Sequence, residues 1–338
     1  MGIHPSHSVT VSAPGKLMLL GEHAVVHRRT CLVTAMDSRL TLRLTLAPRG
    51  DRTFTIRAPD VGVEQVQAPL TAVFAGEQAQ AYGTRFIEST LAVFHEHFGL
   101  ARGVRIETHS DFSSRLGLGS SSATVACTLA ALAHSFAINL DPQAMFELGL
   151  QAIFRVQRTG SGFDLASTIY GGTLFYANHA PRRVVPLNAP DLPLVVAYTG
   201  VKADTTTYVN QVNARLARWS SAMHSIFEAT DRLVAEGRRA LEGADWPRLG
   251  ELMDMQHGLA HALGVDTPET AALVFAARAA GAYGAKLSGA GGGDCIIALV
   301  PEDRRATIEA ALEAAGGQIV RVAPNAPGVR IDARGSRT

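Results

Sequence analysis

Apolar and polar residues alternate along the first third of the chain, with period two, as in half-buried β-strands. Thr41, Arg43 and Thr45 share one face of the longest such run. Pro14-Gly15 is a turn signal between the first two runs, and Gly21 ends the second. Strands are expected at residues 9–12, 17–20, 32–46, 53–57 and 104–108. The N-terminal part is therefore expected to form a sheet.

Later segments place apolar residues at helical spacing, with short apolar strands between them. Asp141 before Pro142 is a typical helix start. Helices are expected at residues 78–98, 125–140, 142–156, 208–263 with a break near Gly243, 267–280 and 302–315. Further strands are expected at residues 173–176, 194–198, 296–300 and 318–322. The proline- and asparagine-containing segment 186–192 is the expected domain junction.

Composition changes this picture little, but it excludes several classes of function. A length of 338 residues favours two domains, and 47% apolar with 18% charged residues suits a globular protein. A net charge of +1 offers no field for nucleic acid or an anionic membrane. The longest apolar run, 125–140, contains polar residues, and residues 1–5 lack a signal-peptide pattern. Three cysteines without metal spacing indicate buried thiols, so a cytoplasmic enzyme is expected.

The strongest candidate for chemistry is a glycine- and serine-rich stretch just before the helix expected at 125–140. Glycine lets a backbone approach a ligand closely, and amides in a first helical turn attract anions. This pattern predicts a phosphate cradle rather than a Walker A loop, because no Gly-Lys-Ser/Thr ends it. The alternative is a turn that merely caps a buried helix. The stretch is Gly117-Leu118-Gly119-Ser120-Ser121-Ser122.

Three other stretches carry polar residues beside apolar strands or glycines. Lys16, Glu22 and His23 flank the strand at 17–20, where each could equally be a surface residue. Asp164 follows Gly160-Ser161-Gly162, where the commonest role of an aspartate is to cap a helix. The last stretch, 289–293, has four glycines in five residues, which suits close approach to a ligand or a tight strand entry.

Together, in this order, the Pro-Gly-Lys strand, the Gly-Leu-Gly-Ser-Ser loop and the Gly-Ala-Gly-Gly-Gly strand entry resemble the GHMP kinase superfamily. The resemblance spans nearly the whole chain and is greatest to mevalonate kinases. It implies a two-domain α/β (α+β) fold with ATP and substrate in the cleft. Residues 1–187 would form an ATP-binding domain like domain 2 of ribosomal protein S5, and residues 188–338 a ferredoxin-like C-terminal domain. No basic stripe or aromatic platform suggests nucleic-acid binding.

The resemblance also assigns roles to individual residues. Asp164 would take the proton from the acceptor hydroxyl, and Lys16 beside it would stabilise the developing charge. The residues of 117–122 would hold the phosphates of ATP, with Ser121 also reaching Mg²⁺. The acceptor pocket would be lined by Lys16, Glu22, His23, Ser161, Asp164, Thr199, Gly289, Ala290 and Gly291. Positioning and charge neutralisation are sufficient for phosphoryl transfer.

Some residues depart from the mevalonate kinase pattern. Ile153 stands where a second magnesium carboxylate is expected, and the loops around Asp164 and 288–295 are closer to those of phosphomevalonate kinases. The segment 21–26 and the C-terminal half are instead similar to mevalonate kinases, and they carry more weight because 21–26 would touch the acceptor. The acceptor is therefore expected to be mevalonate, with 5-phosphomevalonate as the alternative. A non-catalytic metabolite-binding protein of this fold is the remote alternative, opposed by the retained Lys16 and Asp164. A homodimer is the expected assembly.

The extra dianion of 5-phosphomevalonate would need basic side chains near the acceptor. Four candidates stand close to the motifs in sequence, and each could equally be a solvated surface charge. They are Arg28, Arg29, Arg158 and Lys202. His23 suits a hydroxyl or carboxylate better than a phosphate dianion, which favours mevalonate.

Overall fold

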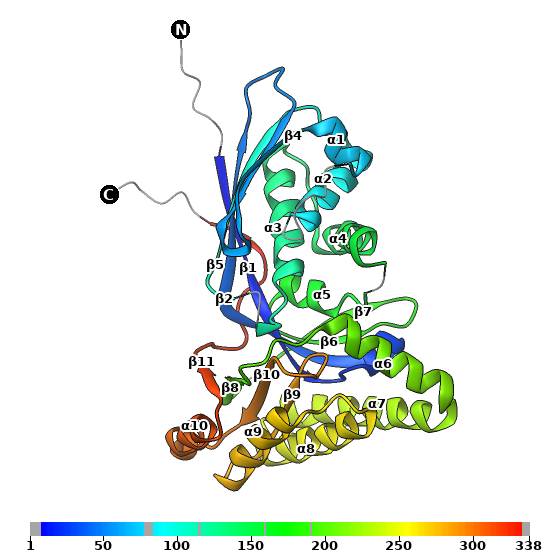
Figure 1. Ribbon diagram of the computed structural model, residues 1–338, viewed down its shortest axis with the longest axis vertical. Coiled ribbons are helices and arrows are strands. Elements are labelled where there is room, and N and C mark those ends of the chain that lie inside the picture. The colour runs from blue at the N-terminus through cyan, green and yellow to red at the C-terminus, as the bar shows by residue number, and fades with distance from the viewer. Residues whose placement is uncertain (1–7, 78–83, 114–115, 159, 190, 333–338) are drawn as a thin grey trace.

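The computed structural model describes residues 8–77, 84–113, 116–158, 160–189 and 191–332. It has two parts, each made of one sheet and its helices, which are stacked end to end and are called the two layers below (Figure 1). In this part of the chain there are two sheets. The larger contains β1 (Ser8–Leu20), β2 (Thr30–Leu46), β3 (Thr53–Ala58), β4 (Val63–Pro69), β5 (Val104–Ser110), β6 (Thr173–Ala177), β7 (Arg183–Leu187) and β12 (Arg330–Ile331). The smaller contains β8 (Leu194–Tyr198), β9 (Gly284–Ser288), β10 (Cys295–Leu299) and β11 (Gln318–Val320).

Helices divide between the two sheets in the same way. The larger sheet carries α1 (Leu70–Ala75), α2 (Arg85–Phe98), α3 (Ser120–Ser135), α4 (Pro142–Gln157) and α5 (Phe163–Tyr170). The later part of the chain forms α6 (Thr205–Arg218), α7 (Ser220–Glu242), α8 (Trp246–Leu263), α9 (Pro268–Ala279) and α10 (Arg305–Ala314). Short 3₁₀ helices are η1 (Ala24–His27), η2 (Pro59–Val61) and η4 (Glu302–Arg304).

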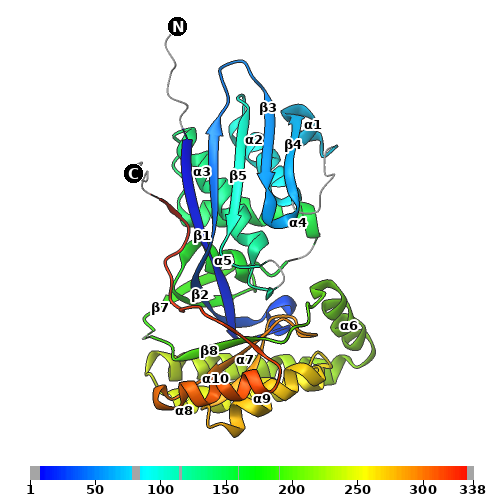
Figure 2. The same cartoon turned by 60° about the vertical axis from the view of Figure 1, so that its left-hand side comes forward.

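The larger sheet is built around the long antiparallel pair of β1 and β2 (Figure 2). Its order is β12-β1-β2-β5-β3-β4, and β6 and β7 extend from the far end of β2. The helix α3 packs on β1 and β2, and its side chains Leu129 and Leu132 are fully buried. The apolar run in α3 is therefore a core helix.

The smaller sheet has the order β11-β8-β10-β9, with every neighbouring pair antiparallel. The helices α8 and α9 pack against β9, and α10 packs against β11 and β8. The far end of β1 also contacts α7, α8 and β9. Residues at the end of β1 consequently lie where the two layers meet.

The turn predicted at Pro14-Gly15 is wrong. The two predicted strands are one continuous strand, β1, and the register with β2 shifts between Pro14 and Gly15. Proline has no N–H to donate to the ladder, and a bulge is one of the few positions in a sheet that tolerates it. Pairing with the long β2 therefore overrides the local turn signal.

Most other predicted elements are confirmed, with some omissions. Helices break at Gly243 as predicted, and also at Trp219, where α6 ends. Part of the predicted helix 78–98 is confirmed as α2, while 78–83 lies outside the described residues. The predicted junction 186–192 begins inside a strand, β7. Some elements were not predicted, because their segments are short or polar or have loop-like sequences. They are β4, β7, β9, β12 and α1.

The end of the chain returns to the first layer. After β11, Pro324 bridges to Met36, and β12 pairs with β1. A boundary between residues 187 and 188 stays a prediction. Among the described residues, no helix is both long and apolar enough to cross a membrane. Cys31, Cys127 and Cys295 are buried free thiols, as expected.

Candidate active site

The predicted phosphate cradle forms a loop and the first turn of α3. Gly119 is the N-cap, with φ 89°, and no side chain caps the helix. The first-turn N–H groups are therefore open to an anion, and the helix dipole favours negative charge there. Ser122 is buried, whereas Ser120 and Ser121 are half-buried. A Cβ on Gly119 would lie 3.1 Å from Cγ of Lys16, so glycine permits both the left-handed backbone and this close approach.

Lys16, in β1, is held against this loop by its backbone and its side chain. Its N–H donates to the Leu118 carbonyl at 2.9 Å, and its Nζ donates to the Gly117 carbonyl at 3.1 Å. The same Nζ lies 3.1 Å from Oδ1 of Asp164 and 5.4 Å from the centre of the Phe163 ring. The structure thus brings together a lysine, an aspartate and the predicted phosphate loop, which are far apart in the sequence.

Asp164 does not cap a helix. The N-cap of α5 is Gly162, with φ 85°, and Asp164 lies in the first turn of that helix. Its side chain is 34% exposed, and its buried Oδ1 faces Lys16. Ser161 is buried, and its carbonyl accepts a hydrogen bond from the Tyr176 hydroxyl at 2.5 Å. An aspartate that is partly open to solvent, next to a lysine, can accept a proton from a bound hydroxyl.

Glu22 is fully buried rather than exposed to an open pocket. It forms an ion pair with Lys286 of β9, and both side chains are 1% exposed. The second carboxylate oxygen, Oε2, is buried and has no hydrogen-bond partner among the described residues. Burial raises the pKa of Glu22 and lowers that of Lys286, while each charge opposes the shift of the other.

His23 connects the end of β1 to the glycine-rich segment 289–293. Its Nε2 lies 2.8 Å from the Ala290 carbonyl, so this nitrogen carries the proton and donates. Burial lowers the pKa of His23 to about 4. Gly289 and Gly291 flank Ala290 with φ 125° and 79°. The predicted residues His23 and 289–291 therefore lie together.

Thr199 closes the loop after β8. Its hydroxyl accepts a hydrogen bond from the Val201 N–H at 3.2 Å, and its own N–H donates to the Asp294 carbonyl at 2.9 Å. Asp294 is buried, and its carboxylate accepts from the Ala203 N–H at 3.0 Å and lies 3.3 Å from Nζ of Lys202. Thr199 is thus in contact with Asp294, which directly follows the glycine-rich segment.

Asp294 and Lys286 are two residues that the sequence did not single out. A Cβ on Gly117 would lie 2.2 Å from Oδ2 of Asp294, so this carboxylate sits directly against the phosphate loop. Asp294 has φ 53°, which an aspartate tolerates better than most residues. Its place directly after a run of glycines was the available signal. For Lys286, a lysine inside an apolar strand was the signal.

Ile153, where a carboxylate was expected, is a buried residue of α4. A Cβ on Gly160 would lie 3.4 Å from Cγ2 of Ile153, so these two residues are close together. Among the described residues, no three His, Cys, Asp or Glu side chains gather in a group that could hold a metal ion.

Comparison with known proteins agrees with this geometry. Residues 85–172 match the model of the GHMP kinases N-terminal domain, and residues 238–318 match that of the GHMP kinases C-terminal domain. The chain is 32% identical to the mevalonate kinase of Thermococcus sibiricus over 96% of this chain and 98% of that enzyme. The chain belongs to the GHMP kinase family. As a GHMP kinase it is a small-molecule kinase with ATP as phosphate donor.

Two solved structures of this family are informative. The L. major mevalonate kinase in complex with R-mevalonate has a TM-score of 0.76 and 25% identity, covering 97% of this chain and 98% of that one. The Streptococcus pneumoniae phosphomevalonate kinase, in complex with phosphomevalonate and AMPPNP, has a TM-score of 0.77 and 17% identity, covering 94% and 99%. The second likeness shows the fold alone. Sequence similarity therefore lies on the mevalonate kinase side of the family.

Proposed function

We propose that this GHMP kinase transfers the γ-phosphoryl group of ATP to the 5-hydroxyl of mevalonate, giving 5-phosphomevalonate. The observation that carries this proposal is the 3.1 Å contact between Nζ of Lys16 and Oδ1 of Asp164, beside the open first turn of α3. The curated relatives with about 31% identity over 96% of the chain are mevalonate kinases.

Each group then has one role in the transfer. The N–H groups and hydroxyls of Gly117, Leu118, Gly119 and 120–122 bind the phosphates of ATP. Asp164 accepts the proton of the acceptor hydroxyl as the new O–P bond forms. Lys16 faces the Asp164 carboxylate at 3.1 Å and stabilises the charge on the transferring phosphoryl group.

The acceptor lies between these groups and the residues from the second layer. Ser161 and Thr199 bound the space near Asp164. His23, as a neutral imidazole, holds the glycine-rich segment through Ala290, so that Gly289 and Gly291 close over the acceptor. Glu22 contributes its unpartnered oxygen to the same region, with Lys286 holding its other oxygen in place.

Magnesium fits this site as an ion brought by the nucleotide. Ser121 would hold the ion through its hydroxyl, together with phosphate oxygens of the nucleotide and waters, which is a common arrangement for this metal. The buried Ile153 contributes no ligand. When bound, Mg²⁺ neutralises phosphate charge.

Two of the four basic residues that could recognise an acceptor phosphate are already paired. Arg29 lies 3.3 Å from Asp231, and Lys202 lies 3.3 Å from Asp294. This favours mevalonate over 5-phosphomevalonate, since a dianion needs cations that are not already neutralised. The test is an ADP-release assay with both acceptors, in which mevalonate has the higher kcat/KM.

A further inference from the structure

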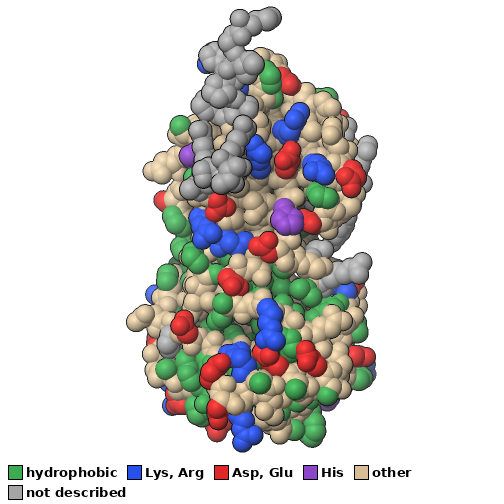
Figure 3. All heavy atoms as spheres, turned by 90° about the vertical axis from the view of Figure 1, so that its left-hand side faces the viewer, with side chains coloured by type: hydrophobic (Ala, Val, Ile, Leu, Met, Phe, Trp, Pro, Cys, Tyr) green, Lys and Arg blue, Asp and Glu red, His purple; other side chains and the backbone are tan. Residues whose placement is uncertain are grey.

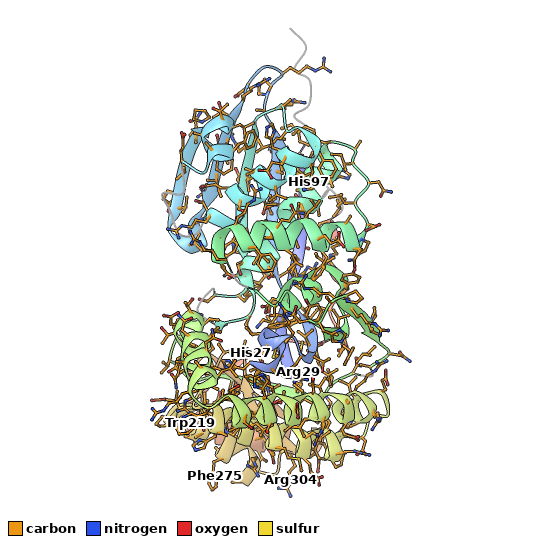
Figure 4. The ribbon with its side chains drawn as sticks, turned by 90° about the vertical axis from the view of Figure 1, so that its right-hand side faces the viewer. His27, Arg29, His97, Trp219, Phe275 and Arg304 are labelled. Atoms are coloured by element: carbon orange, nitrogen blue, oxygen red, sulfur yellow. The ribbon has the colours of Figure 1, made fainter. Side chains whose placement is uncertain are left out.

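A cavity of about 400 Å³ lies between η1 and the helices α6 and α7. Its lining comes from Val26, His27, Arg28 and Arg29 on one side, and from Leu216, His224 and Phe227 on the other. Figure 4 shows His27 and Arg29 at the junction between the two layers. Neither Lys16, nor Asp164, nor the loop 117–122 lines it, so the cavity is separate from the site described above.

The lining carries positive charge that the protein does not balance. Arg28 is exposed, and no ion pair or side-chain hydrogen bond joins it to any described residue. In contrast, Arg29 lies 3.3 Å from Asp231 and 3.8 Å from Glu228 on α7, so its positive charge is largely neutralised by these two carboxylates. The cavity thus offers one uncommitted guanidinium.

Arg28 also has an unfavourable backbone conformation. Its φ is 61°, in the left-handed region, where a side chain other than glycine, asparagine or aspartate is uncommon. It ends η1, where its N–H donates to the Ala24 carbonyl, and glycine would serve this role at lower cost. Strain retained at one residue points to a role for its side chain.

Two imidazoles stand beside the guanidinium, and His27 can add a further donor. His27 stacks on Phe227, with 4.4 Å between ring centres, and His224 meets the same ring edge-on at 6.4 Å. Nδ1 of His224 lies 2.7 Å from the Ser220 carbonyl and carries the proton of that hydrogen bond. Burial and the neighbouring His224 lower the pKa of His27. An anion in the cavity would relieve this repulsion.

The rest of the lining is apolar, from Val26, Leu216 and the ring of Phe227. A guanidinium with the imidazole of His27 suits a phosphate, and the apolar wall suits a short hydrocarbon chain beside it. The volume lies within the range of about 300–1,000 Å³ typical of small-molecule sites. We propose that this cavity is a second ligand site, which binds a phosphate monoester carried on a short apolar chain.

Such a ligand would act close to the catalytic residues. The N-cap of η1 is His23, which holds the glycine-rich segment through the Ala290 carbonyl. A ligand joining η1 to α7 therefore stabilises the segment that begins at this histidine. The consequence is a rise in the melting temperature of the full chain when the ligand binds.

The test is calorimetry on the full chain with n-butyl phosphate as the probe and inorganic phosphate for comparison. A non-hydrolysable ATP analogue and mevalonate are both saturating, so that the catalytic site is filled. We expect one molecule of butyl phosphate to bind per chain, at least about fivefold more tightly than inorganic phosphate, because its chain buries apolar surface. Arg28→Gly removes the guanidinium while suiting the left-handed backbone, and it should weaken binding at least tenfold without loss of folding.

The matched control is Arg43→Ala, which removes an exposed arginine of β2 away from the cavity and should leave binding unchanged. His27→Ala, which removes the second donor, should weaken binding as well. The proposal is overturned by unchanged affinity in Arg28→Gly, or by loss of the binding signal once the nucleotide analogue and mevalonate are present. A rise in the mevalonate KM of Arg28→Gly also overturns it, since the cavity would then be part of the acceptor site.

Discussion

Lys286 and Glu22 form an ion pair that joins the two layers of the molecule, with both side chains 1% exposed. Glu22 follows β1 of the larger sheet, and Lys286 lies in β9 of the smaller one. Burial raises the pKa of Glu22, and the charge of Lys286 and, more weakly, that of Lys16 oppose this rise. We therefore expect the buried pair to support both the fold and the site.

Lys286→Met should lower the free energy of unfolding by about 3–5 kcal/mol, because it leaves the Glu22 charge buried without a partner. The measurement is urea unfolding followed by circular dichroism. Adding Glu22→Gln to this variant should restore most of the loss. Arg321→Ala, which breaks an exposed pair with Glu309, serves as the control and should cost less than about 1 kcal/mol. Equal losses in the free energy of unfolding for Lys286→Met and Arg321→Ala would contradict this account.

His23 should make stability depend on pH. Its pKa is about 4 in the folded state, against an ordinary value of 6.5, so between these values the unfolded chain binds a proton that the folded chain does not. The contribution of neutral His23 to the free energy of unfolding is therefore fully present above pH 6.5. It is lost as pH falls towards 4, by about 1.4 kcal/mol per pH unit and roughly 3 kcal/mol in all. His23→Gln keeps a donor for Ala290 and should flatten this slope relative to the parent protein. If the free energy of unfolding changes with pH in the same way for both proteins between pH 7 and 4, His23 is not the group responsible.

Asp164→Asn should fold, bind ATP and lose about two to four decades of turnover, the range for removal of a general base. Single-turnover kinetics and nucleotide binding measure the two effects separately. The control is Asp141→Asn, at the N-cap of α4, where the side chain accepts from the Ala144 N–H at 2.7 Å. Near-normal turnover in Asp164→Asn would mean that this aspartate serves only the start of α5.

Lys16→Met should reduce kcat far more than it raises the KM for ATP. Backbone N–H groups at the start of α3 bind the nucleotide phosphates, whereas Lys16 acts on charge that develops during transfer. Steady-state kinetics with varied ATP separate these effects. A large rise in the ATP KM with unchanged kcat would instead place Lys16 in the nucleotide site.

Local sequence predicted well what local chemistry decides. The cap of α4 by Asp141 and the place of the serines in the first turn of α3 follow from aspartate, glycine and serine at helix starts, although α3 begins five residues before the expected Val125. The family resemblance predicted the pairing of Lys16 with Asp164. The turn at Pro14-Gly15 was mispredicted because its neighbour β2 lies far along the chain. Whether such a segment turns or continues as a strand is decided by its pairing with a distant strand, which the local sequence pattern does not indicate.

The same reason explains what the site analysis missed. Lys286 finds its partner more than 260 residues away, and Asp294 lies against Gly117 in another part of the chain. The place of Glu22 in the acceptor pocket stays a prediction, whereas its burial beside Lys286 could not be predicted because it depends on how the two sheets meet. The surface in Figure 3, where basic and acidic side chains are interspersed, agrees on that face with a net charge of +1.

The central claim is the identity of the acceptor, and the most direct measurement is ADP release with a panel of alcohols. The panel holds mevalonate, 5-phosphomevalonate, homoserine and galactose, each at several concentrations with saturating ATP and Mg²⁺. We expect the highest kcat/KM for mevalonate, and ³¹P NMR should show a phosphate ester on its 5-hydroxyl. A higher kcat/KM for 5-phosphomevalonate, or for either of the other two alcohols, would contradict the proposed function.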